Sequence, residues 1–344
     1  MSGDRVCLAS DNWAPAHPEI LQSIVQANHS FAEPYGADQW TEEAQKELQR
    51  AFGTNAKVFF VSTGTGANVF SLRLAVARYE SIICSDIAHI HYQESGAAEA
   101  LIGCKLLTVP HQKGKVTCEA VQAILAKERA FGKHSTSPKV VSITQPTEVG
   151  TIYSLAELDR LSQLCREENL IFHIDGCRIY HAAVSLNLSL KEMLHVAKPD
   201  LVSVGGTKNG CVAAEAVLLI NPSLEKGSDH LHKQTLQLFS KTRYISAQYL
   251  PFFKKDLWKT CALQANKAAK NLELMVKQIP ELHLSYPVET NQIFFTAPAS
   301  WIARIQRKIL CYVWDQKKGE LRWITSWNTS DQELKTVRSI LYRL

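Results

Sequence analysis

One aspartate and one lysine each follow a short apolar run that is typical of a buried strand. Asp175 comes directly after residues 170–174, and Lys208 follows residues 201–204 across the turn 205–207. Parallel strands end at the same edge of a sheet, so both side chains are expected at one edge. Pyridoxal 5′-phosphate requires such a pair: an amine that forms a Schiff base with its aldehyde, and a carboxylate that keeps its ring nitrogen protonated. A buried Asp–Lys ion pair between neighbouring strands is the alternative.

A loop of small residues, Ser62-Thr63-Gly64-Thr65-Gly66-Ala67-Asn68, follows another apolar run, residues 58–61. If this loop opens a helix, its free N–H groups could hold a phosphate. It does not match the dinucleotide-binding fingerprint, because Val69 occupies the third glycine position, nor the P-loop, because no Gly-Lys-Ser/Thr follows. A purely structural turn explains these residues equally well. The loop's place at the end of a strand, like that of Asp175 and Lys208, favours a ligand site.

Two histidines follow a later strand. His89 and His91 would share one face if their segment is extended, and this spacing can ligate a metal ion. No further set of ligands is suitably placed, so we expect no metal site. An imidazole near a cofactor loop could instead stack on a pyridine ring. For His91, a histidine held by ordinary hydrogen bonds is an equal alternative.

Two arginines could bind a carboxylate. Arg178 lies three residues after Asp175, on the same turn, and a guanidinium is a natural bidentate partner for the carboxylate of an amino acid. Arg322 is a charged residue in the otherwise apolar segment 321–325. Either it pairs with a surface carboxylate, or it points between two domains toward a substrate.

The elements that must position these residues predict an α/β fold. From about residue 55 to 220, short apolar runs alternate with longer stretches of helical spacing, which predicts about seven mostly parallel strands with helices on both faces. In one helix, Ser154 and Glu157 form a capping box, and leucines at 155, 158, 161 and 164 form a core stripe. The expected strands are residues 58–61, 81–84, 106–109, 140–143, 170–174, 201–204 and 216–220.

The remainder predicts a smaller unit. Beyond Ile220 the pattern is helical to about residue 280, including residues 258–277. We place the domain boundary near residue 250. Residues 1–250 would then form an N-terminal segment and a large α/β domain, and residues 251–344 a small C-terminal α+β domain. Its expected strands are residues 282–286, 292–296, 310–314 and 321–325.

Composition is typical of a globular, cytoplasmic protein. The 344 residues are 46% hydrophobic, enough for a large core. No apolar stretch approaches about 18 residues, so we expect no signal peptide and no membrane span. The nine cysteines are scattered without a Cys-x-x-Cys pair, which argues against disulfides and a zinc ribbon. The formal charge of +5 is spread along the chain, so we expect no nucleic-acid face.

Several blocks, in order over nearly the whole chain, resemble the low-specificity L-threonine aldolase family. Its members are pyridoxal-phosphate enzymes of the aspartate aminotransferase fold, fold type I, in the beta-eliminating lyase superfamily. Each block alone is unspecific, whereas the ordered set is specific. The blocks are Ser10-Asp11-Asn12 with His17-Pro18, Thr63-Gly64-Thr65 with Asn68, Ala88-His89 with Glu94, and residues 173–178, 206–210, 240–243, 289–291 and 322–327.

The resemblance implies a role for each matching residue. The residues implied to hold the cofactor are the Schiff-base lysine Lys208, the ring-nitrogen partner Asp175, the ring-stacking His89, the phosphate ligands Gly64 and Thr65, and also Arg178, Thr207 and Arg243. The residues implied to meet the substrate are Ser10, Arg178 and Arg322 at its carboxylate, Tyr35 from the neighbouring subunit, and His134 near its hydroxyl.

The resemblance also implies an activity. It is the retro-aldol cleavage of L-threonine, L-allo-threonine and related β-hydroxy amino acids to glycine and an aldehyde, by a homotetramer built as a dimer of dimers with shared sites. The base for the β-hydroxyl proton stays open between His89, His134 and a bound water. Cys177 stands where the family usually has alanine, and residues 145–147 also depart from its pattern, which leaves the preferred substrate open.

Other functions remain open at this point. Another fold-type-I enzyme, such as a beta-eliminating lyase, an amino-acid racemase or an aminotransferase, would share the aspartate, the lysine and the phosphate loop. A non-catalytic member would bind the cofactor without turnover. A metal-dependent hydrolase using His89 and His91 would lose activity to chelators.

Overall fold

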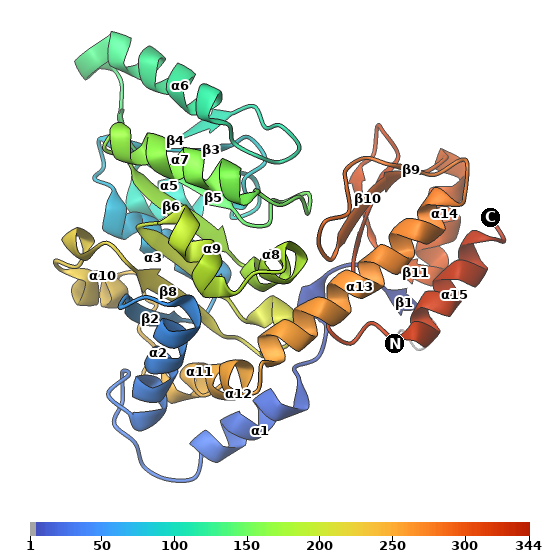
Figure 1. Ribbon diagram of the computed structural model, residues 1–344, viewed down its shortest axis with the longest axis horizontal. Coiled ribbons are helices and arrows are strands. Elements are labelled where there is room, and N and C mark those ends of the chain that lie inside the picture. Colours follow the sequence, from blue (N-terminus) through green and yellow to red (C-terminus); the bar gives the residue numbers. More distant parts are fainter. Residues whose placement is uncertain (1–4) are drawn as a thin grey trace.

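A seven-stranded sheet forms the centre of the larger part of the molecule in the computed structural model, which describes residues 5–344 (Figure 1). The strands lie in the order β2-β8-β7-β6-β5-β3-β4. Neighbours are parallel, except that β8 runs antiparallel to both β2 and β7. Every predicted strand of this sheet is present, so the mostly parallel α/β sheet is confirmed. The strands are β2 (Lys57–Val61), β3 (Glu80–Ser85), β4 (Lys105–Val109), β5 (Ser137–Thr144), β6 (Ile171–Gly176), β7 (Leu201–Gly205) and β8 (Glu215–Leu219).

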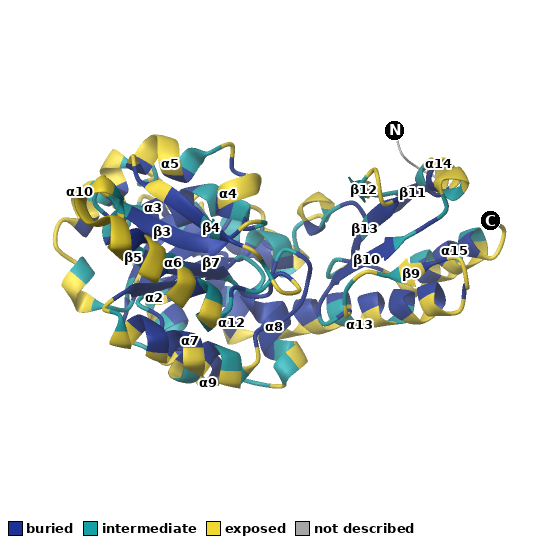
Figure 2. Ribbon diagram, turned by 90° about the horizontal axis from the view of Figure 1, so that it is seen from above, coloured by how far each residue is buried: buried dark blue, intermediate teal, exposed yellow. Residues whose placement is uncertain are grey.

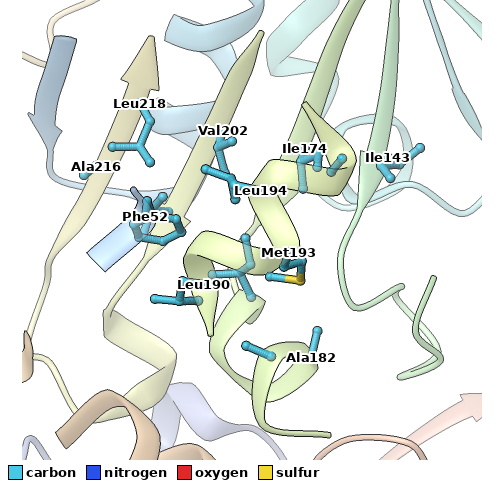
Figure 3. Packing of buried hydrophobic residues seen from close by; sticks show 14 of the residues in the cluster. Phe52, Ile143, Ile174, Ala182, Leu190, Met193, Leu194, Val202, Ala216 and Leu218 are labelled. Atoms are coloured by element: carbon cyan, nitrogen blue, oxygen red, sulfur yellow. The ribbon is translucent and has the colours of Figure 1, made fainter. Parts of the chain in front are cut away.

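Helices cover both faces of the sheet (Figure 2). On one face, Phe52 and Leu194 pack with Val202 of β7 (Figure 3). The helices of that core are α1 (Pro18–Ala27), α2 (Gln39–Phe52), α6 (Cys118–Phe131), α7 (Leu155–Glu167), α8 (Ile179–Leu186), α9 (Leu190–Ala197), α11 (Arg243–Ser246) and α12 (Tyr249–Lys254). On the other face, Phe70 packs with Val217 of β8. The helices there are α3 (Gly64–Ala75), α4 (His89–Tyr92), α5 (Ala97–Ile102) and α10 (Ser228–Gln234).

Helix α7 begins where its sequence predicts. The Ser154 hydroxyl accepts from the Glu157 N–H, and the Glu157 carboxylate accepts from the Ser154 N–H, so the capping box is present. Leu158, Leu161 and Leu164 are buried against the sheet. The leucine stripe therefore serves packing, as expected.

The smaller part contains a four-stranded sheet in the order β12-β13-β10-β9, with helix α13 running beside it (Figures 1 and 2). Phe295 and Trp323 meet edge to face in its core, with ring centroids 4.7 Å apart. Its elements are α13 (Leu257–Lys277), β9 (His283–Leu284), β10 (Gln292–Thr296), α14 (Ala299–Lys308), β11 (Ile309–Leu310), β12 (Tyr312–Asp315), β13 (Glu320–Ile324) and α15 (Asp331–Leu341).

The two parts are joined by shared elements. Strand β1 (Val6–Cys7) pairs with β11, so the start of the described chain packs on the smaller part. The single strand predicted at 310–314 is two strands, because β11 pairs with β1 and β12 with β13. Helix α13 contributes Trp258 to the first core and Leu272 to the second. The boundary near residue 250 stays a prediction.

The sheet brings four chain segments to one edge. Strands β2, β6 and β7 run in the same direction and end there, and the antiparallel β8 begins there. Two short 3₁₀ turns complete this edge, η1 (Asp11–Trp13) packed against η3 (Thr207–Asn209). The other 3₁₀ turns are η2 (Gly132–His134) and η4 (Pro222–Leu224). Within residues 5–344, no helix has both the length and the apolar character needed to cross a membrane.

Candidate active site

A chain of hydrogen bonds joins the predicted ring-nitrogen partner to the predicted ring-stacking histidine. Asn68, in α3, donates through Nδ2 to Asp175 Oδ2 at 2.8 Å and to Glu94 Oε1 at 3.0 Å. His89 Nδ1 lies 2.8 Å from the same Glu94 oxygen. An ionised carboxylate can only accept, so His89 carries a proton on Nδ1, and Nε2 is the nitrogen that is left to exchange a proton. One amide thus bridges two buried carboxylates.

Asp175 stays ionised although its side chain is buried. Burial alone would raise the pKa of this carboxyl group, but the charges of His89 and Lys208 and the hydrogen bonds from Asn68 and Cys177 outweigh it and lower the pKa below its ordinary 3.8. The Cys177 N–H donates to Asp175 Oδ1 at 3.0 Å. A buried, ionised carboxylate is the partner that a protonated pyridine nitrogen needs.

The expectation that His89 and His91 share one face is wrong, because both lie in the short helix α4. Residues two apart in a helix point about 200° apart. His91 is exposed, whereas the His89 backbone N–H donates to Glu148 Oε1 at 2.9 Å. Burial raises the pKa of Glu148 above its ordinary value, against hydrogen bonds from Thr144 and His89. Among residues 5–344, no group of three or more His, Cys, Asp or Glu side chains could hold a metal ion.

The N terminus of α3 presents N–H groups without acceptors. Thr63 caps the helix by accepting from the Gly66 N–H at 2.9 Å. In the described part of the chain, the N–H groups of Gly64 and Thr65 have no acceptor. A Cβ on Gly64 would meet nothing within 4 Å except Glu215 Oε2, at 4.0 Å, so the space there is open. Free N–H groups and open space at a helix N terminus suit a phosphate.

Lys208 reaches this edge without a partner of its own. It follows β7 in η3, and its ammonium makes no ion pair or hydrogen bond to residues 5–344. Its positive charge nevertheless contributes to lowering the pKa of Asp11 and of Asp175, so it lies near both carboxylates. The Thr207 hydroxyl accepts from the Ala214 N–H at 3.1 Å and ties η3 to the start of β8.

These features fit pyridoxal 5′-phosphate. Lys208 is an unpaired amine, Asp175 is ionised, and the start of α3 is open with free N–H groups. Asn68 Oδ1 and Glu94 Oε2 are buried without a hydrogen-bond partner in the described chain, which leaves polar atoms at this edge to be satisfied by a ligand or by water.

Arg178 holds Asp11 in a bidentate ion pair. Its Nε lies 2.6 Å from Oδ2 and its Nη2 2.9 Å from Oδ1, while Asn291 Nδ2 donates to Oδ2 at 3.1 Å. Burial raises the pKa of Asp11, but the charge and hydrogen bonds of Arg178 outweigh it and lower the pKa to about 2. Ser10, the N cap of η1, lies beside the pair, with its Oγ 3.5 Å from Asp11 Oδ1. The Arg178 Nη1 has only the Cys177 sulfur nearby, at 3.9 Å, and can still donate to a ligand.

Arg322 has no acidic partner among the described residues. Its guanidinium lies 5.0 Å from the ring centroids of both Tyr312 and Trp314, and its Nε is buried without a hydrogen bond. Burial and the charge of Arg178 lower the pKa of Arg322 to about 10, which leaves it protonated at neutral pH. Pairing with a surface carboxylate is therefore the wrong interpretation. Two guanidinium groups lie near one carboxylate, that of Asp11, with which only Arg178 pairs, and the excess positive charge suits a carboxylate ligand.

The predicted place of His134 near the substrate stays a prediction, because within its own chain His134 lies away from this edge. His134 belongs to η2, which precedes β5, and it is exposed. The neighbouring Ser137 donates its N–H to the carbonyl of Tyr79, which directly precedes β3. Helix α6 thus returns the chain to the amino edge of the sheet, opposite the edge where Lys208 lies.

Two other predicted residues make no contact with this edge in the described chain. Tyr35 is 51% exposed, and the Lys233 ammonium lies 4.6 Å from its ring centroid. The Arg243 guanidinium lies over the Tyr244 ring at 5.1 Å, with its Nε buried and unpartnered. The side chain of Gln237, rather than Arg243, lies directly against the phosphate loop at Gly66.

Several residues at this edge had no role assigned from the sequence. Asp11, Asn68 and Glu94 belong to the sequence blocks that resemble the aldolase family. Their polar side chains within these short motifs were the only feature of the sequence that could have marked them as site residues. Glu148 and Glu215 gave a weaker signal, a single acid at the border of an apolar run.

Comparisons with known proteins show which family this chain belongs to. The model of the beta-eliminating lyase family matches residues 8–299. A low-specificity L-threonine aldolase from a Pseudomonas species is 35% identical over 328 residues, which cover 95% of this chain and 94% of that relative. The solved structure of Leishmania major threonine aldolase superposes with a TM-score of 0.92 at 29% identity, covering 98% of this chain and 99% of that one. Aspartate aminotransferase from Thermus thermophilus, at 14% identity and a TM-score of 0.72 over 99% of this chain and 91% of that one, shows the fold alone. The predicted fold class is confirmed.

Proposed function

Because this chain belongs to the beta-eliminating lyase family and, within it, to the low-specificity L-threonine aldolases, we propose that it is a pyridoxal-phosphate-dependent carbon–carbon lyase. It cleaves L-threonine, L-allo-threonine and related β-hydroxy amino acids to glycine and an aldehyde. The observation that supports this most is the meeting of an unpaired Lys208, an ionised Asp175 and the Arg178–Arg322 pair at one edge of the sheet.

The residues of this edge divide the task of holding the cofactor. Lys208 would bond to its aldehyde, Asp175 would keep its ring nitrogen protonated, and His89 would lie against its ring. The N–H groups of Gly64 and Thr65 would hold its phosphate. When bound, pyridoxal 5′-phosphate supplies an electron-withdrawing ring that accepts the electron pair of the breaking bond.

Arg178, Arg322 and Ser10 orient the substrate. The Arg178 Nη1 and the Arg322 guanidinium offer donors to the substrate carboxylate, and Ser10 adds a hydroxyl beside them. Fixing the carboxylate would keep its own bond to Cα from breaking and would leave the Cα–Cβ and Cα–H bonds as the candidates for cleavage. Removal of the β-hydroxyl proton by a nearby base would then favour cleavage of the Cα–Cβ bond.

His89 is the proton acceptor for the β-hydroxyl group. Glu94 holds its Nδ1 proton, so Nε2 is the nitrogen that can take a proton, directly or through a water molecule. We prefer His89 to His134 for this role, since within one chain His134 lies at the opposite edge of the sheet.

The assembly and the cell compartment stay predictions. Tyr35 is half exposed, which is compatible with a dimer in which it reaches a neighbouring site. We propose a homotetramer with shared sites, acting on threonine in the cytoplasm.

The test is a spectrum combined with a product assay. The purified protein should absorb in the visible range, the absorbance should change on adding L-threonine or glycine, and threonine should yield glycine and acetaldehyde. Lys208→Ala should lose the visible absorbance and all turnover. Keto-acid formation in place of aldehyde release would refute the lyase, and an unaltered Lys208→Ala variant would refute the role of Lys208.

A further inference from the structure

Glu215 occupies the centre of the site edge. It is the first residue of β8 and pairs in register with Val61, the last residue of β2, and with Gly205, the last residue of β7. The phosphate loop follows Val61, and the turn with Lys208 follows Gly205. Glu215 therefore lies between the two segments that would hold the cofactor's phosphate and its aldehyde.

The Glu215 carboxyl group faces the start of α3. Its Oε2 is 4.0 Å from the position that a Cβ on Gly64 would take and 2.9 Å from that on Gly205. Any side chain on Gly205 would collide with it. The residue is only 6% exposed, so water solvates this carboxyl poorly.

The surroundings of Glu215 favour its neutral form. Burial raises its pKa to about 7, while contacts with Thr207 and the charge of Lys208 work in the opposite direction. Besides Lys208, the titratable groups facing it are Asp175, Cys211 of the η3 turn, Tyr180 of α8 and Tyr249 of α12. Burial raises the pKa of the Cys211 thiol and of both phenols, so these three are neutral. Asp175 adds a second negative charge on the same side.

A phosphate at the N terminus of α3 would add further negative charge beside this carboxyl. Two like charges in a poorly solvated place repel strongly, whereas a protonated carboxyl group can donate a hydrogen bond to a phosphate oxygen. The helix N terminus offers N–H donors but no proton that can move, so Glu215 is the nearby group whose charge can adjust.

Resting on the proposed function, we propose that Glu215 is a positioning residue for the phosphate group. It holds a proton while phosphate is bound at Gly64 and Thr65, and it donates a hydrogen bond to that phosphate. Binding of a phosphorylated ligand therefore takes up a proton at this carboxyl, and ionisation of Glu215 weakens the binding.

The experiment measures ligand affinity rather than turnover. The full-length chain, freed of cofactor, is titrated calorimetrically with pyridoxamine 5′-phosphate, which has no aldehyde to bond with Lys208, and with pyridoxamine, which has no phosphate. The variants are Glu215→Gln, which keeps the volume and a donor without the charge, and Glu320→Gln as the matched control. Glu320 is likewise a buried glutamate, but it begins β13 in the smaller part of the molecule.

We expect the wild type to lose affinity for pyridoxamine 5′-phosphate, relative to Glu215→Gln, by about 25-fold between about pH 6.5 and pH 8.5. Titrations in buffers of different ionisation enthalpy should show about one more proton taken up by the wild type than by Glu215→Gln at the higher pH. Glu320→Gln should follow the wild type, and the affinity for pyridoxamine should be the same in all three proteins.

The outcomes separate this inference from the proposed function. If wild type and Glu215→Gln bind the phosphorylated ligand equally at every pH, with equal proton uptake, the role of Glu215 is refuted while the phosphate site stands. If the wild type does not distinguish pyridoxamine 5′-phosphate from pyridoxamine, the phosphate site at α3 is refuted as well. If Glu215→Gln fails to fold, the wild type still tests the proposal: no proton uptake on binding pyridoxamine 5′-phosphate at about pH 8.5 would refute the role of Glu215.

Discussion

The substitution Arg322→Ala should separate substrate binding from cofactor binding. Arg322 has no acidic partner in the described chain, so its removal leaves no buried carboxylate unpaired. The expected loss is one or two charge-assisted hydrogen bonds to the substrate carboxylate, each worth about 1.5 to 3 kcal/mol. We therefore expect KM for threonine, and the dissociation constant for glycine, to rise by about 10- to 100-fold.

The contrast with Arg178 strengthens this test. Arg178→Ala would leave Asp11 buried without its ion pair, so that variant should also lose about 3 to 5 kcal/mol of unfolding free energy. Arg322→Ala should keep the thermal midpoint, because it removes a buried cation that lies beside the like charge of Arg178. Glycine titrations followed by absorbance, steady-state kinetics with threonine, and thermal unfolding measure these effects.

The matched control is Arg338→Ala, which removes an exposed arginine from helix α15 and should change none of the three measurements. An Arg322→Ala variant with wild-type KM would refute the assignment of Arg322 to the substrate. Loss of the visible cofactor spectrum would mean that Arg322 supports the cofactor instead.

Three further predictions concern the neighbouring residues. Asn68→Ala should lower the unfolding free energy by about 2 to 4 kcal/mol, because Asp175 and Glu94 lose their shared donor; a urea midpoint equal to that of the wild type would contradict this. The pKa of Asp11 in the folded protein, about 2, lies below the ordinary 3.8, so its ion pair with Arg178 stabilises the fold above about pH 4. The free energy of unfolding should therefore fall by about 2 kcal/mol as the pH is lowered toward 2. Unfolding measured at a series of pH values should show this slope, and Asp11→Asn should remove it. Trp314→Ala should raise KM by about two- to fivefold for every amino acid, because the Arg322 guanidinium loses one of the two rings that hold it in place. An effect on threonine but none on glycine would show instead that Trp314 contacts the substrate side chain.

The fold and the main site residues could be predicted from sequence because they depend on local patterns. Each buried strand is a short, mostly apolar run, and in a parallel sheet the residue after such a run must lie at the carboxyl edge. Asp175 follows its run directly and Lys208 follows its run across a short turn, so their meeting required no knowledge of packing. The capping box of Ser154 and Glu157 is local in the same sense.

Glu215 shows where this reasoning ends. An apolar run does not reveal the direction of its strand, and in an all-parallel sheet the first residue of a strand lies at the edge opposite the site. Strand β8 is antiparallel to both of its neighbours, which brings Glu215 to the site edge. The edge at which His134 lies within its chain was hard to predict for a related reason, because the length of helix α6 and the direction of β5 decide it, and neither is contained in the residues beside it.

The distribution of charge at this edge divides the site into two halves with different tasks. In one half, the carboxylates of Asp175 and Glu94 are held by the neutral amide of Asn68, which balances neither charge, so this half stays negative and favours protonated nitrogen. In the other, Arg178 and Arg322 lie near the carboxylate of Asp11, with which only Arg178 pairs, so this half stays positive and favours a carboxylate. The negative half would meet the ring nitrogen of the cofactor, and the positive half would meet the carboxylate that every α-amino acid has, so neither half can distinguish one substrate from another. Discrimination must then come from residues that meet the side chain beyond Cβ, which makes broad specificity the expected behaviour of this arrangement.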